Sequence, residues 1–109
     1  MHYIISIAKQ FSEFPTGRFY SDTDVSGQAF REKFLVPRLK AGDSLLIDLD
    51  DVEGFGSSFL DEAFGGLIRL EGFRLNELNK NIKFKSEEDP SLIVEINGYL
   101  SDAEARKNK

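Results

Sequence analysis

The stretch that decides the fold is residues 44–70, SLLIDLDDVEGFGSSFLDEAFGGLIRL. An apolar run at residues 45–49 is typical of a buried strand, and a loop punctuated by glycines follows it at residues 53–58. Apolar residues then recur at helical spacing and form one broad stripe that faces a core. The members of this stripe are Leu60, Ala63, Phe64, Leu67 and Ile68. The stretch therefore predicts a strand, a tight turn and a central helix that begins beside two serines.

The chain before this stretch predicts two strands and a helix. Residues 2–8 are β-branched and aromatic, which is typical of a strand buried on both faces or nearly so. Residues 18–20 lie between two turn signals and predict a short second strand that forms a hairpin with the first. Ser26 is a good N-cap for a helix, and Pro37 predicts that this helix ends near Leu35 or kinks and resumes as a short turn.

The chain after this stretch predicts one more strand and a last helix. Residues 82–85 alternate between apolar and charged, as in a strand with one solvated face. The Asp-Pro pair at residues 89–90 is a strong helix start, and residues 101–109 form a charged tail that we expect to fray. Strands joined through helices imply right-handed crossovers. We therefore expect a single α/β domain over residues 1–109, with its core at about 2–100 and helices packed on a small mixed, mostly parallel sheet.

The composition excludes several classes of protein. The 109 residues carry a formal net charge of −5, and an acidic surface repels the phosphate backbone of nucleic acids. The chain has no cysteine, so disulfides and thiol ligands are excluded, which fits a reducing cytoplasm. No apolar run approaches the roughly 18 residues of a membrane span, and the first residues lack the features of a signal peptide. We therefore expect a cytoplasmic protein that binds neither nucleic acid nor membrane.

The charged and polar residues specify no catalytic centre. His2 is the only histidine and lies at the terminus, so we expect neither a histidine-based triad nor a zinc site. An acidic cluster follows the central strand, where α/β sheets bind ligands, and its oxygens would suit a hard cation. Its members are Asp48, Asp50, Asp51 and Glu53. Because their spacing matches no metal-binding loop, we expect no metal there. No arrangement of carboxylates, Ser, Lys or Arg specifies catalysis, so we also expect no catalytic residues and no cofactor. A modest basic group near the first helix is expected to lie at the surface. It comprises Arg31, Lys33, Arg38 and Lys40.

The two serines at the start of the central helix allow two interpretations. Ser58, with Asp61 three residues later, resembles a capping box, which predicts that Ser58 is a structural N-cap worth about 1 kcal/mol. Ser57 then lies just outside the helix and is exposed. Alternatively, the pair is a site of phosphorylation or partner contact, because free amides at a helix N-terminus favour a phosphate. Asp61 and Glu62 would then lie in the first turn and repel a permanently bound phosphate.

The same helix carries two adjacent glycines in its middle. Gly65 and Gly66 cost roughly 2 kcal/mol relative to alanines, so they predict either close packing or a flat surface that a partner approaches. Asp61, Gly65 and Arg69 share the face opposite the apolar stripe, and this face is either a docking strip or a plain solvated surface. We assign the predicted interaction face to Phe55, Gly56, Asp61, Glu62, Gly65 and Arg69.

Two separated segments resemble the STAS-like family of unknown function. Residues 46–52 and 57–67, LIDLDDV and SSFLDEAFGGL, carry the main motif, and residues 26–31 with 35–39 match an earlier part of the family pattern. The resemblance implies a relationship to STAS domains, which occur in the tails of sulfate transporters and in anti-sigma factor antagonists. Those domains are small α/β modules that regulate and do not catalyse, so the resemblance implies the same role here.

The resemblance also draws attention to the serines. In the antagonists, a strand ends in an Asp-Ser-Ser-Gly turn whose first serine is phosphorylated by a partner kinase. Ser57 matches that first serine and Ser58 matches the second. Gly56 replaces the aspartate and Phe59 replaces the glycine, so this turn departs from the pattern that the antagonist kinases read.

The leading hypothesis is a non-enzymatic regulatory module that binds a protein partner through Ser57, Ser58 and the exposed face of the central helix. By analogy with anti-sigma factors, the partner would be a histidine-kinase-like ATPase domain. Phosphorylation of Ser57 would release it through repulsion beside Asp61 and Glu62. Two alternatives stay open: a small-molecule or nucleotide sensor that uses a cleft near residues 48–58, and a structural subunit that self-associates. A weak homodimer is also compatible with the sequence.

Overall fold

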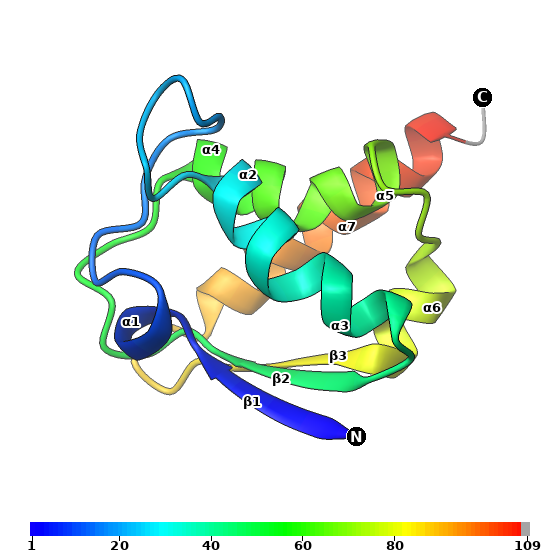
Figure 1. The fold of residues 1–109 in the computed structure, drawn as a ribbon, viewed down its shortest axis with the longest axis horizontal. Coiled ribbons are helices and arrows are strands. Elements are labelled where there is room, and N and C mark those ends of the chain that lie inside the picture. The colour runs from blue at the N-terminus through cyan, green and yellow to red at the C-terminus, as the bar shows by residue number, and fades with distance from the viewer. Residues whose placement is uncertain (108–109) are drawn as a thin grey trace.

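Three short parallel strands form the sheet of the domain. The computed structural model describes residues 1–107 and gives these strands as β1 (His2–Ser6), β2 (Ser44–Asp48) and β3 (Ile82–Lys85). The middle strand is β2, and its Ile47 lies between Ile5 of β1 and Phe84 of β3 (Figure 1). Parallel neighbours cannot be joined by a tight turn, so each connection crosses over through helices. The predicted α/β fold, a small sheet with helices packed on it, is confirmed.

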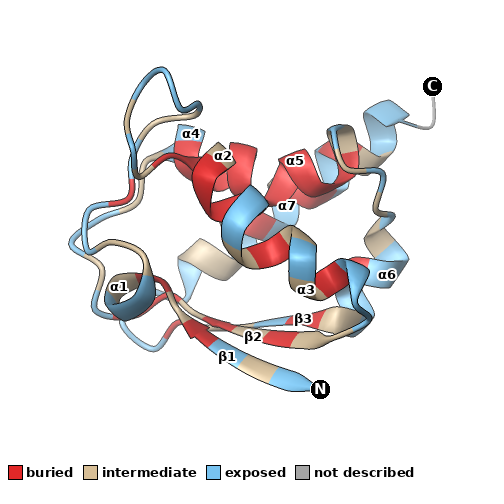
Figure 2. Ribbon diagram, in the orientation of Figure 1, coloured by how far each residue is buried: buried red, intermediate tan, exposed pale blue. Residues whose placement is uncertain are grey.

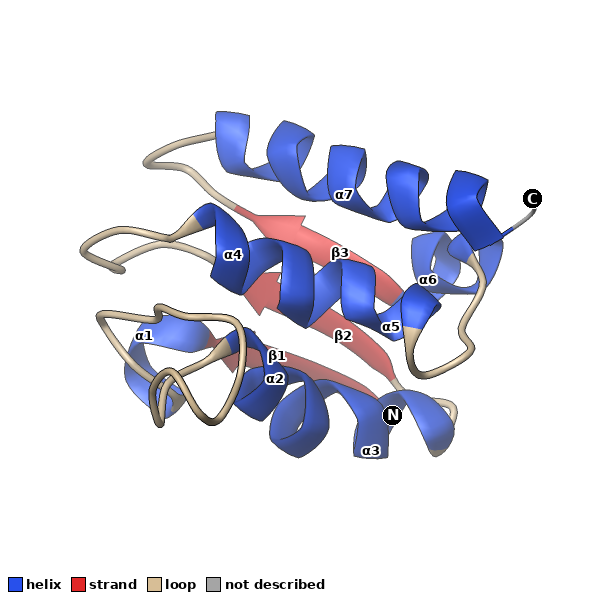
Figure 3. Cartoon of the chain, turned by 90° about the horizontal axis from the view of Figure 1, so that it is seen from above, coloured by secondary structure: helices blue, strands red, loops and turns tan. Residues whose placement is uncertain are grey.

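Three helical rods cover one face of this sheet. The helices are α1 (Ile7–Gln10), α2 (Gly27–Phe30), α3 (Val36–Lys40), α4 (Ser57–Leu60), α5 (Gly66–Arg69), α6 (Leu75–Asn81) and α7 (Ser91–Lys107). Two π-helical turns, η1 (Arg31–Leu35) and η2 (Asp61–Gly65), join α2 to α3 and α4 to α5 into longer helices. Figure 3 shows these two helices and α7 side by side over the strands. The helix of residues 57–69 lies between the other two, as its predicted central place requires.

This central helix supplies the middle of the core. Its predicted apolar stripe is fully buried, and Figure 2 shows buried residues concentrated where the helices face one another and the sheet. Phe59 is buried as well, and its ring centroid lies 6.0 Å from that of Phe30 in α2. On the sheet side, the ring of Phe64 meets that of Phe84 at 5.3 Å in an edge-to-face contact. The Phe-rich composition therefore produces one connected aromatic core.

Pro37 does not end its helix. The N–H of Val36 bonds to the carbonyl of Arg31, five residues earlier, so the chain is already in π geometry before it reaches the proline. Pro37 then lies in the first turn of α3, where an intrahelical donor is not required. Of the two predicted outcomes, the observed one is therefore the helix that resumes beyond residue 35.

Within residues 1–107, no helix covers the opposite face of the sheet (Figure 1). In β1, Ile5 points to the core and is buried, whereas Ile4 points away from it and is 70% exposed. The prediction that this strand is buried on both faces is therefore wrong, because its side chains alternate between core and solvent. The strand also ends at Ser6, whose side chain caps α1 by accepting from the amide of Lys9 at 3.2 Å.

The short strand predicted at residues 18–20 is not present. Asp22 closes a turn there, because its Oδ2 accepts from the amides of Arg18 at 3.2 Å and Phe19 at 2.9 Å. Amides engaged in this turn cannot join a ladder with β1. Within the chain that the structure describes, the sheet is therefore entirely parallel and not mixed as predicted.

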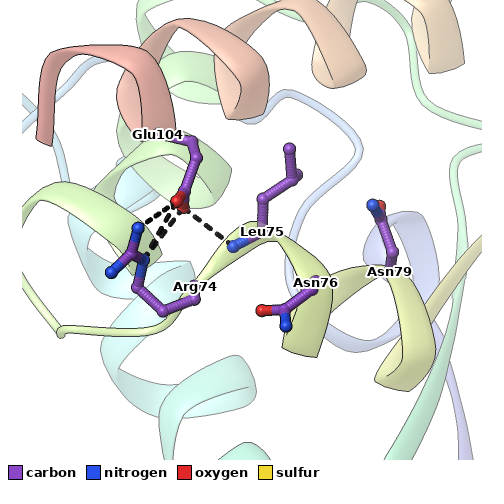
Figure 4. A pocket seen from close by; sticks show the side chains of 5 residues that line it. All are labelled: Arg74, Leu75, Asn76, Asn79 and Glu104. Atoms are coloured by element: carbon purple, nitrogen blue, oxygen red, sulfur yellow. Dashed lines mark hydrogen bonds and ion pairs between the residues drawn. The ribbon is translucent and has the colours of Figure 1, made fainter. Parts of the chain in front are cut away.

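The last helix continues through most of the segment that we expected to fray. Glu104 forms an ion pair with Arg74 and accepts a hydrogen bond from the first amide of α6 at 2.9 Å, beside a surface pocket (Figure 4). Farther along, Nζ of Lys107 donates to a backbone carbonyl of α5 at 2.9 Å. These contacts hold residues 101–107 in α7, so the prediction of a frayed tail is wrong for them. Residues 108–109 lie outside the described part.

Gly27 permits the close approach of α2 to the central helix and provides a test of it. A Cβ at this position would lie 2.5 Å from the carbonyl oxygen of Phe59 and 2.9 Å from the backbone nitrogen of Ala63. We expect Gly27→Ala to lower the free energy of unfolding by about 1–3 kcal/mol, the usual cost of overpacking, as measured by urea denaturation. Gly98→Ala in α7 is the control, since no described atom lies within 4 Å of its Cβ. The free energy of unfolding of the control should instead rise by about 0.5–1 kcal/mol. Equal effects of the two variants would contradict the close approach of the helices.

Candidate functional site

Ser57 and Ser58 occupy the first two positions of the central helix, and both are exposed. The N-cap is Gly56, which has an extended backbone and accepts the helical bond from the amide of Leu60 at 3.2 Å. The prediction that Ser58 is the N-cap is wrong, because the helix starts two residues earlier than a Ser58 cap would require. Gly56 has no side chain with which to bond the orphan amides of the first turn. We name residues 55–58 the serine corner; it presents two hydroxyl groups together with these amides.

Apolar surface adjoins the serine corner. Phe55 is half-buried, with its ring centroid 5.9 Å from that of Phe59. Phe14 is 64% exposed and, together with Gly56, lines a surface cavity of about 420 Å³. Aromatic side chains of this kind are enriched where proteins contact one another. The corner therefore combines polar groups that can be modified with apolar surface that a partner can cover.

On the other side of the corner, α7 contributes a tyrosine and a carboxylate. The hydroxyl of Tyr99 donates to Oε2 of Glu95 at 2.5 Å. This hydrogen bond, followed by burial, raises the pKa of Tyr99 to about 12, while a contact with the hydroxyl of Ser57 acts in the opposite direction. Tyr99 therefore keeps its proton at neutral pH and links Glu95 to the corner.

The exposed face predicted for the central helix is largely covered by its own side chains. Nη1 of Arg69 donates to Oδ1 of Asp61 at 3.0 Å and lies over Gly65, where a Cβ would come within 2.6 Å of it. Gly65 and Glu62 are buried, so the expectation that they belong to an interaction face is wrong. Asp61 and Arg69 keep 25% and 28% of their side chains exposed and remain accessible beside the corner.

A buried arginine joins the first long helix to the central helix. Arg31 is 2% exposed; its Nη1 donates to Oε2 of Glu62 at 2.7 Å and to the carbonyl of Glu62 at 2.6 Å. Its Nε donates to Oε2 of Glu71 at 3.0 Å. Gly66 leaves room for the guanidinium, because a Cβ there would lie 2.3 Å from Nη1. The glycine pair thus serves close packing, and the prediction that Arg31 belongs to a basic surface group is wrong.

Arg18 extends this network to the loop before α2. Its Nη1 lies 2.9 Å from Oδ2 of Asp61 and 3.4 Å from Oε1 of Glu62. Burial raises the pKa of Asp61, whereas hydrogen bonds from Arg18 and Arg69 lower it. The lowering effects outweigh that of burial, so the pKa of Asp61 lies below its ordinary value. Because the helix begins at Ser57, Asp61 lies in its second turn. The predicted repulsion of a phosphate by Asp61 and Glu62 is therefore not supported, since arginines already compensate both carboxylates.

Two members of the acidic cluster after β2, Asp48 and Asp50, bond to the surrounding chain. Asp50 is buried and accepts from the amides of Glu88 at 3.0 Å and Glu87 at 3.2 Å, and from Nζ of Lys85 at 3.2 Å. The bond from the amide of Glu88 is the largest influence and lowers the pKa of Asp50, against the opposing effect of burial. Asp48 accepts from the amide of Asp50 at 2.9 Å. The cluster orders the connection from β3 to α7, and the described residues hold no group of three or more His, Cys, Asp or Glu side chains that could bind a metal.

These features fall within a region that matches a known family. Residues 26–92 match the family model of the STAS-like domain of unknown function. The chain belongs to this family. The match contains Arg31, Glu62 and the serine corner of this STAS-like domain, whereas Arg18 and β1 lie before it. No curated protein and no solved structure matches the chain. Among residues 1–107, no helix combines the length and the apolar character that crossing a bilayer requires.

Sequence patterns identify the serine corner but miss its supporting residues. They predict Arg18 as part of a strand, and they connect neither Arg18 nor Tyr99 with the serines. The pair Gly65-Gly66 is a local signal that large side chains cross the helix. Nothing local indicates that one of them is Arg31, which lies 31 residues before its partner Glu62.

The buried pair of Arg31 and Glu62 should dominate the stability of this layer. Arg31→Met removes the closest cation partner of a buried carboxylate, and we expect it to lower the free energy of unfolding by about 3–5 kcal/mol. Lys33→Met, at an exposed position of the same helix, should change it by no more than about 0.5 kcal/mol. Urea denaturation followed by circular dichroism measures both. A similar small effect of the two substitutions would show that the buried pair does not hold the helices together.

The lowered pKa of Asp61 makes part of the stability depend on pH. An acid whose pKa is lower in the folded than in the unfolded state stabilises the fold above the unfolded value of about 4, and this stabilisation is lost as the pH falls through the folded value. Asp61→Asn should therefore be clearly less stable than the wild type at pH 7, with the difference shrinking on acidification. Urea midpoints across this pH range measure it, with Asp102→Asn at an exposed position of α7 as the control. A difference that stays constant with pH would argue against the network.

Proposed function

We propose that this STAS-like domain is a non-enzymatic, cytoplasmic regulatory module that binds a partner protein through the serine corner. The observation that carries the proposal is the exposed pair Ser57 and Ser58 at a helix N-terminus whose N-cap residue has no side chain. Charge added at this end interacts directly with the helix dipole and the orphan amides. A small chemical change at the corner therefore has a large effect on what the corner can bind.

The surroundings of the corner favour a protein as the partner. Phe14 and Phe55 provide apolar surface on either side of Gly56, and partly exposed Asp61 and Arg69 provide polar surface next to it. An apolar centre with a polar border is the usual anatomy of a protein interface.

The network behind the corner supports a rigid contact surface. Arg31 ties the central helix to the first long helix, and Arg18 ties it to the loop that carries Phe14. Binding to a surface that is already ordered costs less conformational entropy than binding to a mobile one.

The resemblance to anti-sigma factor antagonists supports Ser57 as the position of phosphorylation and a histidine-kinase-like ATPase domain as the partner. A phosphate there would add about −1.5 to −2 charges, and a contact that covers the corner would have to desolvate them. The nearby carboxylate of Glu95 adds repulsion, because it lies beside Tyr99 and forms no ion pair within the described chain. In this proposal Glu95 supplies the repulsion of the phosphate that the sequence pattern assigned to Asp61 and Glu62.

The proposal is tested by partner capture with a charged corner. Immobilised wild-type domain should retain a partner that Ser57→Glu retains at least about tenfold less, since the glutamate imitates part of the phosphate charge. Ser57→Ala should retain it like the wild type. Ser101→Glu places the same charge on an exposed part of α7 and is the matched control. Undiminished recovery with Ser57→Glu, or an equal loss with Ser101→Glu, would refute the role of the corner.

A further inference from the structure

A second feature adjoins the serine corner at the carboxyl edge of the sheet. A cleft of about 390 Å³ opens between the loop that follows β2 and the start of α7. Four apolar residues that belong to the core or pack against it line the cleft: Leu49, Val52, Phe55 and Leu92. Phe55 belongs to the serine corner as well, so the cleft and the corner form one continuous surface. Parallel α/β sheets commonly bind their ligands outside this edge.

Carboxylates from three segments of the chain line the same cleft. They are Glu53, Glu88, Asp89 and Glu95. Within residues 1–107, none of these carboxylates lies within 4.0 Å of a basic side chain. The buried carboxylates of Asp50 and Glu62 and the partly exposed carboxylate of Asp61, in contrast, all have a lysine or arginine partner. The cleft is thus a place where the negative charge of the domain is not compensated by the domain itself.

Three of these carboxylates are oriented by the chain while they keep an oxygen for another donor. Glu88 uses Oε1 to accept from the amide of Asp51 at 2.7 Å, and Glu95 uses Oε2 to accept from Tyr99 at 2.5 Å. Asp89 uses Oδ1 to accept from the amide of Ser91 at 3.1 Å. An ionised carboxylate has two oxygens and accepts several hydrogen bonds. The oriented groups can therefore receive a cationic donor without giving up the bonds that hold them.

We propose that this cleft receives an arginine side chain of the partner protein. The inference rests on the proposed function and adds the chemistry of the partner to it. An arginine combines a stem that packs on apolar surface with a head that needs carboxylates, and the lining of the cleft offers both apolar side chains and carboxylates. Its guanidinium directs five donors in one plane, which suits carboxylates that converge from several segments better than the point charge of lysine does. The flat head also stacks on an aromatic ring, here that of Phe55.

The test uses arginine itself as the probe. The full-length ¹⁵N-labelled domain is titrated with N-acetyl-arginine N-methylamide, with the lysine compound, and with the neutral citrulline compound of the same shape. Amide signals should shift at residues 49–55 and 86–95, and the arginine probe should bind at least about tenfold tighter than the citrulline probe. Added salt should weaken the binding, because the carboxylates are partly exposed.

Variants locate the binding. Glu53→Gln and Glu88→Gln should weaken arginine binding severalfold, since glutamine keeps the shape and an acceptor oxygen but removes the charge. Asp102→Asn removes one charge from an exposed position of α7 and should leave binding unchanged. Equal binding of arginine and citrulline, equal weakening by Asp102→Asn, shifts elsewhere on the domain, or no shifts at all would each overturn the proposal.

Failure of this inference is distinguishable from failure of the proposed function. Ser57→Glu should bind the arginine probe at least as well as the wild type, because its added charge has the same sign as the cleft. Arginine binding at the cleft, combined with undiminished partner capture by Ser57→Glu, would overturn the proposed function of the corner alone. Loss of partner capture in Ser57→Glu, combined with undiminished capture by Glu53→Gln and Glu88→Gln, would overturn the cleft alone.

Discussion

The buried ion pair between Arg31 and Glu62 is the interaction on which the arrangement of the helices depends. A guanidinium in a core needs hydrogen-bond acceptors for its N–H donors. Arg31 donates to the side chain and the carbonyl of Glu62 and to the side chain of Glu71. Meeting this demand requires the first long helix and the central helix to approach closely, which Gly27 and Gly66 permit. Both helices have a π turn at this crossing, and the carbonyl of Glu62 in η2 accepts from Nη1 of Arg31. The buried ion pair therefore lies where Gly66, the two π turns and the close helix spacing meet.

Periodicity and turn chemistry were sufficient for the elements whose signals are local. The central helix follows from its apolar stripe and the middle strand from the run at residues 45–49, because burial of one face dictates both patterns. The strand predicted at residues 18–20 failed because Asp22 captures the amides that a strand would need. The helical end of α7 was missed because Arg74 and the carbonyl of Ile68, which hold it, are distant in sequence. In each case the error arose where a contact with a remote part of the chain, or a side-chain bond to the backbone, outweighed the local preference.

In the candidate site, too, some features follow from local sequence signals and others from contacts between remote parts of the chain. The serine corner follows from residues that are adjacent in sequence, and its exposure agrees with the expectation for Ser57. The charges around it depend on tertiary contacts, and these reversed two expectations: Asp61 and Glu62 are compensated, while Glu95 from a different helix lies near the serines. A motif therefore located the corner, but only the packing of α7 and of the loop before α2 determines the electrostatic environment in which it works.

The parallel order of the strands also has a consequence for how the chain is made. Tyr3 pairs with Leu45, and Leu45 pairs with Ile82, so each ladder of the sheet joins residues separated by about forty positions. During synthesis the first strand leaves the ribosome long before its neighbour exists, and the phenylalanines of the first helix emerge without the helix that will cover them. The nascent chain therefore carries an unpaired, apolar first half until the middle strand and the central helix have both been translated. The sheet is therefore completed only late in synthesis, once β3 has been translated as well.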